Sequence, residues 1–360
     1  MKKFLALVLT LIMIAGLVGC GGKKEEAPAA SAPAASAPAT SAPAAKDEGV
    51  EYDEIVISAA SGFTEYVSAH QAWLLFEQIV EERSGGAMQV ELYPNQQLGG
   101  DREFTEACAQ GNVTMGSPSS SPAAAFCAAL NVYDSPFIYA DRETAYKALD
   151  SEAGKAILDA MESANLKGLG CFENGFRNLT CNREINTLAD LAGLKIRVME
   201  NDVHMGIWRA LGANPSPLAF GELYTALQQG AFDAQENPME QIYNTKFQEV
   251  QDHIYLTNHV YTPYIVFMNL DVWNGLNDAS KALVQEAVDE AVAFQREQCI
   301  INEQECIDKI NALDYSHVYP VSEELRAEMI AACAPVYDQV RQLAGEEITN
   351  NFYAACGFEG

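Results

Sequence analysis

The chain has 360 residues, and its 50 acidic side chains outnumber its 22 lysines and arginines, which gives a formal net charge of −28. A charge this negative argues against nucleic acid or an anionic lipid surface as a binding partner. It also means that a site for an anionic ligand needs a cation of its own nearby, because screening weakens the field beyond about 8–10 Å.

The N-terminus has the pattern of an export signal. Lys2 and Lys3 precede an apolar run over residues 4–18, which is too short to span a bilayer comfortably but is typical of a signal-peptide core. The run ends in Leu-Val-Gly-Cys20, which resembles the bacterial lipobox. That resemblance implies that residues 1–19 are removed and Cys20 is diacylated, since two acyl chains hold a protein stably on a membrane. The alternative is an ordinary signal peptide with an incidental cysteine.

Residues 20–51 consist largely of alanine, proline and serine. Such a segment has almost nothing to bury, so we expect it to be disordered. Prolines recur every five residues, at Pro28, Pro33, Pro38 and Pro43, and favour extended conformations. The segment is interpreted as a tether between the lipid and the folded part.

From Tyr52 onward the composition is globular, and a segment of this length usually forms two domains. We expect strands over residues 55–57, 88–93, 113–116, 166–172, 178–181 and 194–198, and a loop over 117–122. Helices are expected over 66–83, 101–110, 142–149, 152–164, 202–211, 221–229 and 278–312, and two more begin at Ser322 and after Ala344. This alternation indicates α/β sheets with crossover helices, whose binding crevice lies beyond the carboxyl ends of the strands.

Nine cysteines occur, eight of them after Cys20. An even number in an exported chain would allow disulfides. A domain of this size does not need them, and no Cys-x-x-Cys pair is present, so we expect mostly buried free thiols. Cys299 and Cys306, seven residues apart on the expected long helix, are about 10.5 Å apart and too distant to bridge.

Motifs of catalysis are missing from the sequence. The five histidines form no His-x-x-x-His pair, and there is no phosphate-binding Gly-x-x-x-x-Gly-Lys, no Gly-x-Ser-x-Gly and no Gly-x-Gly-x-x-Gly. Pairs of acidic residues are numerous, but at this net charge they are expected by chance. The sequence therefore predicts no enzyme, no cofactor and no metal site.

The most specific pattern lies between Gly175 and Pro238. It contains Gly-Phe-Arg177-Asn, Leu-Ala-Gly-Leu-Lys-Ile-Arg197-Val, Ala-Phe220-Gly-Glu-Leu-Tyr and Gln-Glu-Asn237-Pro, preceded upstream by Leu-Gly-Gly-Asp-Arg over 98–102. From Tyr52 to about Val340 the chain resembles the solute-binding (DctP-type) family of tripartite ATP-independent periplasmic, or TRAP, transporters. The spacings of 20, 23 and 17 residues between the four named positions are similar to those of the family's sialic-acid branch.

The resemblance implies a fold of two α/β domains with a ligand cleft between them, crossing strands and a long hinge-spanning helix, as in type II periplasmic binding proteins. Residues 278–312 suit that helix. We expect domain I to comprise residues 52–174 and 263–302, and domain II to comprise 175–262 and 303–360.

The family's ligand-binding positions fall on Arg197, Arg177, Phe220, Asn237 and Ser119. Arg197 ends a strand, where a guanidinium can hold a carboxylate through two parallel hydrogen bonds. Arg177 could instead form a structural ion pair, Phe220 could pack in the core, and Asn237 before Pro238 could cap a helix. Ser119 replaces the acid expected in the sialic-acid branch, which argues against that ligand. The weaker candidates are Asn269, Glu65, Tyr66 and His70.

The implied function is binding of a small organic carboxylate, namely a C4-dicarboxylate, a sugar acid or a 2-oxo acid, and its delivery to the TRAP membrane permease subunits. The protein would act outside the cytoplasmic membrane, on its outer face, held by the lipid. The alternative is a sensory lipoprotein that presents the same class of carboxylate to a receptor.

Overall fold

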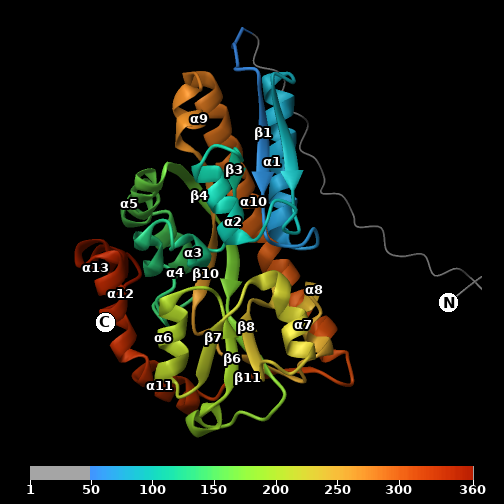
Figure 1. Ribbon diagram of the computed structural model, residues 1–360, viewed down its shortest axis with the longest axis vertical. Helices are drawn as coiled ribbons and strands as arrows, with labels where there is room; N and C mark the ends of the chain where they lie inside the picture. The colour runs from blue at the N-terminus through green and yellow to red at the C-terminus, as the bar shows by residue number, and fades with distance from the viewer. Residues whose placement is uncertain (1–48, 360) are drawn as a thin grey trace, which may run out of the picture. The chain divides into compact units, whose positions relative to one another are not determined.

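The computed structural model describes residues 49–359, which contain two β-sheets with helices packed on them (Figure 1). The signal peptide, Cys20 and the tether as far as residue 48 lie outside the described residues. The first lobe is built on a five-stranded sheet in the order β2 (Met88–Tyr93), β1 (Ile55–Ala60), β3 (Met115–Gly116), β10 (Tyr261–Asn269) and β4 (Leu166–Phe176).

The second lobe is built on a six-stranded sheet. Its order is β11 (His317–Pro320), β9 (His253–Leu256), β5 (Asn178–Cys181), β8 (Ala234–Asn237), β6 (Lys195–Val198) and β7 (Asn214–Pro217). In the first sheet β1 runs parallel to β2 and β3, and in the second β6 runs parallel to β7 and β8. The carboxyl ends of these parallel strands therefore define the edge of each sheet at which a ligand crevice forms.

Two chain segments and one helix connect the lobes. β4 of the first sheet is followed, after Arg177 alone, by β5 of the second, and β10 returns the chain from β9 to the first sheet. The helix α10 (Asp278–Asn311) packs on α1 and β4 in the first lobe and on α8 and β11 in the second. The predicted crossing strands and hinge-spanning helix are confirmed. The domain limits given above remain a prediction.

The helices begin and end where capping chemistry dictates. Asp141, Asn201 and Asn277 cap their helices by accepting a backbone N–H bond, and Gly85 ends α1 in the left-handed conformation. The remaining α-helices are α1 (Ser68–Ser84), α2 (Asp101–Ala109), α3 (Ser120–Ala123), α4 (Arg142–Leu149), α5 (Glu152–Asp159), α6 (Asp202–Ala210), α7 (Leu223–Gln228), α8 (Met239–Asn244), α9 (Leu270–Gly275), α11 (Glu323–Ala332), α12 (Ala334–Ala344) and α13 (Glu346–Ala355).

Several elements differ from the sequence predictions. The single helix expected over 152–164 is divided into α5 and the 3₁₀ helix η2 (Ala160–Ala164). The loop expected over 117–122 contains the start of α3. Three helices, not two, follow β11, because Pro335 in the first turn of α12 starts a new helix after Cys333. The strands β7, β8, β9, β10 and β11 were not predicted.

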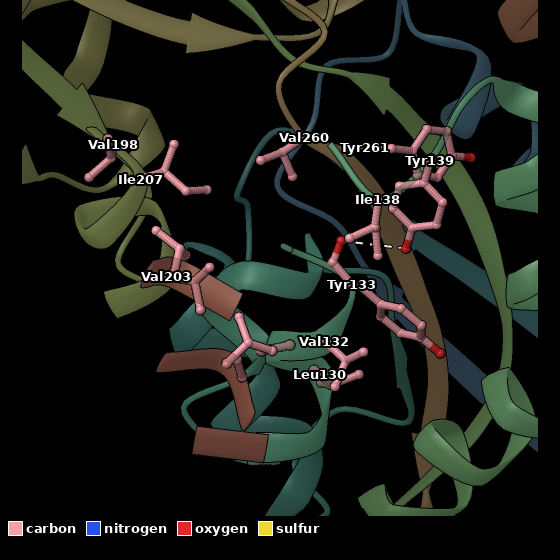
Figure 2. Close-up of a cluster of buried hydrophobic side chains, with 14 of the residues drawn as sticks. Leu130, Val132, Tyr133, Ile138, Tyr139, Val198, Val203, Ile207, Val260 and Tyr261 are labelled. Atoms are coloured by element: carbon pink, nitrogen blue, oxygen red, sulfur yellow. Dashed lines mark hydrogen bonds between the residues drawn. The ribbon is translucent and has the colours of Figure 1, made fainter. Parts of the chain in front are cut away.

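One apolar cluster contains residues of both lobes (Figure 2). Leu130 and Val132 of the 3₁₀ helix η1 (Ala128–Val132) belong to the first lobe, and Val198, Val203 and Ile207 belong to β6 and α6 of the second. All five side chains are buried. The lobes therefore share a continuous apolar core on this side of the molecule.

The eight cysteines of residues 49–359 are buried free thiols, Cys299 and Cys306 on α10 among them. Burial raises the pKa of the Cys171 thiol to about 12, which keeps it protonated at neutral pH. Within the described residues, no helix is both long enough and apolar enough to cross a bilayer.

Candidate ligand-binding site

A cavity lies between the lobes and is partly open to solvent. Its walls are formed by the segments that follow β1, β2 and β3 in the first lobe and β6, β7 and β8 in the second. It is lined by Gly62, Phe63, Gln96, Gly100, Asp101, Glu103, Ser119, Pro122, Asn174, Arg197, Met199, Glu200, Leu218, Ala219, Phe220, Asn237, Gln241 and Tyr264. The strand ends predicted to form a crevice therefore do form one.

Arg197, near the end of β6, is the cation that lines this cavity within residues 49–359. Its side chain is almost fully buried. Nε and Nη2 donate to the carbonyl oxygen of Leu218, at 2.8 and 2.6 Å, which fixes the guanidinium plane. Nη1 has no partner in the described part of the chain. Burial, assisted by the nearby Arg177, lowers the pKa of Arg197 to about 10, so the group is still charged at neutral pH.

Arg177 lies behind the cavity wall and is not among its lining residues. It forms a buried ion pair with Glu236, in which Nη2 lies 2.9 Å from Oε1 and Nε contacts Oε2. Burial of Glu236 opposes its ionisation, but Arg177, His204 and His259 together hold its pKa below the ordinary value. The direct ligand contact predicted for Arg177 is not what this geometry provides, because its charge is already matched by Glu236.

Asn237 lines the cavity from the end of β8. Its Oδ1 accepts a hydrogen bond from Arg177 Nη2 at 3.1 Å, and its Nδ2 donates to Gln235 Oε1 at 2.5 Å. The helix-capping role considered from the sequence is wrong, because α8 begins at Met239 and the residue before it is Pro238. Pairing with Asn178 of β5 keeps Asn237 in the sheet.

Phe220 and Ser119 also line the cavity, from opposite lobes. Phe220 opens the 3₁₀ helix η4 (Phe220–Glu222), and its ring meets that of Phe247 edge-on at 6.1 Å between centroids. Ser119, which precedes α3, donates its backbone N–H to Asp101 Oδ2 at 2.9 Å. Its Oγ is buried and has no partner in residues 49–359.

The remaining predicted residues lie away from the cavity. Asn269 caps α9 by accepting from Val272 N, and its amide donates to the carbonyl oxygen of Cys108 at 2.8 Å. Glu65 and Tyr66 are exposed and His70 is half-buried, and none of the three lines the cavity. The geometry therefore leaves Asn269 with a structural role and gives no site role to the other three.

Residues 61–343 match the model of a protein family described as bacterial extracellular solute-binding protein, family 7, the DctP family. The chain belongs to this family. It is 32% identical over 273 residues to the C4-dicarboxylate-binding periplasmic protein DctP of Rhodobacter capsulatus, covering 76% of this chain and 82% of the relative.

Two crystal structures resemble this family member closely. A sugar acid binding protein from Advenella mimigardefordensis, in complex with galactonate, superimposes with a TM-score of 0.82 at 30% identity, covering 85% of this chain and 99% of the other. A TRAP periplasmic solute-binding protein from Shewanella oneidensis with bound succinate gives 0.80 at 30% identity, covering 84% and 99%. These likenesses confirm the predicted resemblance to TRAP solute-binding proteins and the predicted two-domain α/β fold. The solute-binding role also places the protein outside the cytoplasm.

Sequence reasoning missed several lining residues of this solute-binding protein. Asp101 keeps some exposed surface as a residue, but its carboxyl group is enclosed, and burial raises its pKa to about 7. Asn174 and Gln241 are buried, and each has an amide oxygen without a partner among residues 49–359. Asp101 belongs to the Leu-Gly-Gly-Asp-Arg motif quoted above, but nothing in the sequence distinguished it from the other acidic residues, of which the chain has 50 in all.

A second, wider hollow lies on the first lobe between α5, β4 and α10. Its three cations are paired: Lys155 with Glu152, Lys167 with Asp159 and Glu162, and Arg296 with Asp150. The interlobe cavity differs in presenting buried polar atoms that are still available, so it is the better candidate for binding a solute.

Proposed function

We propose that this TRAP solute-binding protein holds a small organic carboxylate in the interlobe cavity and delivers it to the membrane permease. The observation that carries the proposal is the unpartnered Nη1 of a buried, charged Arg197 whose orientation is fixed by Leu218. A charged group left without a partner in a buried site is costly. A ligand carboxylate accepting from Nη1 and from the remaining Nη2 hydrogen would satisfy it.

The proposal follows the names of the relatives, which bind succinate, galactonate and C4-dicarboxylates. Contacts made to the ligand from both lobes stabilise the closed form, which the permease then receives. Binding of this kind involves no chemical step, so we propose a carrier and not an enzyme. The sensory alternative receives no support from these relatives.

Calorimetric titration of a panel of small carboxylates tests the binding role. Wild type should bind at least one of them, and Arg197→Ala should bind it about 30- to 5,000-fold more weakly, since truncating one partner of a buried charge pair costs about 2–5 kcal/mol. Arg197→Lys should recover only part of the lost affinity, because an ammonium group cannot form the two parallel hydrogen bonds of a planar guanidinium. Arg183→Ala, at an exposed arginine of the same lobe, is the control. Equal affinity of Arg197→Ala and wild type would disprove the proposed binding of the carboxylate by Arg197.

We propose further that diacylated Cys20 holds the protein on the outer face of the cytoplasmic membrane. The support is the lipobox-like sequence and the tether that follows it. In fractionated cells the wild-type protein should sediment with membranes, and Cys20→Ser should be soluble. Retention of the Cys20→Ser protein in the membrane fraction would overturn this part of the proposal.

A further inference from the structure

The interlobe cavity is lined by more acidic than basic side chains. Arg197 is its cation among the described residues, while Asp101, Glu103 and Glu200 supply three carboxyl groups. Glu103 and Glu200 are exposed, so solvent screens them, whereas the carboxyl of Asp101 is enclosed. Arg197 can neutralise one ligand carboxylate. A second carboxylate on the same ligand would have no cation here to meet it.

The unpartnered atoms in the walls are mostly acceptors. Asn174 Oδ1 and Gln241 Oε1 are buried with no partner within residues 49–359, and Ser119 Oγ can accept as well as donate. Gln241 is oriented by its Nε2, which donates to Tyr264 Oη at 2.6 Å. Acceptors of this kind are satisfied by ligand hydroxyl groups and repel ligand oxygens that carry charge.

Asp101 is held in the cavity wall by Ser119 and by the space left at Gly62. Its Oδ2 accepts from Ser119 N at 2.9 Å. Its Oδ1 lies where a Cβ on residue 62 would stand only 2.1 Å away, so the carboxyl reaches this position because residue 62 is glycine. Asp101 and Arg197 interact electrostatically, but no ion pair within 4 Å joins them in the described part of the chain. The two side chains are therefore not bonded to each other, and each can bind a different group of the ligand.

We propose that the ligand is a hydroxylated monocarboxylate, and that Asp101 selects it by accepting a ligand hydroxyl and repelling a second carboxylate. The inference rests on the proposed function, because it assigns one end of the same ligand to Arg197. It goes further in naming a polyhydroxy acid as the substrate class and Asp101 as the residue that discriminates it from a dicarboxylate.

The test uses acids matched in carbon number. At pH 8 the wild-type protein is titrated with erythronate, succinate and butyrate, which have four carbons, and with gluconate, adipate and hexanoate, which have six. The hydroxylated acid of at least one set should bind, and the dicarboxylate and the plain acid of that set should each bind at least about 100-fold more weakly.

Asp101→Asn keeps the size of the side chain but removes its charge. It should weaken binding of the hydroxylated acid about 10- to 100-fold and strengthen binding of the dicarboxylate, so that the selectivity narrows. Glu106→Gln, at an exposed acid on the same helix, should change neither affinity. Retention of full selectivity by a folded Asp101→Asn protein would show that the residue does not discriminate.

The experiment distinguishes a failure of the inference about substrate class from a failure of the proposed function. If a dicarboxylate binds wild type as tightly as its hydroxylated counterpart, and Arg197→Ala abolishes both, the inference about substrate class is wrong and the proposed function stands. If wild type binds none of the six acids, the inference about substrate class is wrong, and the wider panel of small carboxylates tests the proposed function separately.

Discussion

Glu240 on α8 of the second lobe accepts two hydrogen bonds from Ser68, the first residue of α1 in the first lobe. Its Oε2 lies 3.0 Å from the backbone nitrogen and 3.0 Å from Oγ of Ser68. Val67, which precedes the helix, provides no side-chain cap. The carboxyl of one lobe therefore caps a helix of the other, a contact that exists only while the lobes are together.

The pH dependence of stability should report on Glu240. Burial raises its pKa from 4.5 to about 7, despite the Ser68 bonds. The folded protein then binds more protons than the unfolded chain between these values, so this group's contribution to stability falls as pH rises from about 4.5 to 7. Glu240→Gln keeps an acceptor for Ser68 without this penalty. The melting temperature of Glu240→Gln minus that of wild type should therefore increase from pH 5 to pH 8.

The control for that measurement is Glu328→Gln, at an exposed acid on α11. Its melting temperature should follow wild type throughout the pH range. At pH 8 the gain from Glu240→Gln should be on the order of 3 kcal/mol at most, at about 1.4 kcal/mol per pKa unit. A difference between Glu240→Gln and wild type that does not change with pH would contradict the assignment.

The two arginines should separate stability from binding. Arg177→Ala leaves Glu236 buried without its guanidinium partner, which should lower the free energy of unfolding by about 3–5 kcal/mol. Arg197→Ala removes a group that has no acidic partner in the cavity wall, so unfolding should change little while affinity falls steeply. Urea denaturation and calorimetric titration of both variants measure the contrast. A larger loss of affinity in Arg177→Ala than in Arg197→Ala would reverse the roles argued above.

The buried cysteines should be unreactive in the folded protein. Burial raises the pKa of Cys333 and of Cys356 to about 12, and the thiolate is the reactive form. In the Cys20→Ser protein, Ellman's reagent should label few thiols within minutes, and all eight after denaturation without reductant. Fewer than eight in the denatured protein would reveal a disulfide.

Local patterns in the sequence predicted much of the fold. The range of β2 was predicted correctly from its alternation, which depends only on residues close together in the chain, and the range of α4 was also predicted correctly. The strand β10 was missed because it is buried along its whole length and has no polar alternation to mark it.

The site was harder to predict because its contacts are distant in sequence. For Arg177 the sequence left a ligand contact and a structural ion pair both open. The choice depends on the pairing of β5 with β8, which brings Glu236 to Arg177, while Arg197 lies beside the carbonyl of Leu218. Asp101 depends in the same way on Gly62, which lies 39 positions before it.

Gly62 provides a last test of how Asp101 is held. A methyl group on residue 62 would meet Asp101 Oδ1 at 2.1 Å, and this short side chain is fixed by Ser119 N–H, so the carboxyl has to move. Gly62→Ala should weaken binding of the hydroxylated acid at least about tenfold with no change in charge. In an Asp101→Ala background the same substitution should have little effect, because the clash is gone. Gly275→Ala, where a methyl group meets nothing within 4 Å, is the control. Additive losses in the double variant would mean that Gly62 acts on the ligand independently of Asp101.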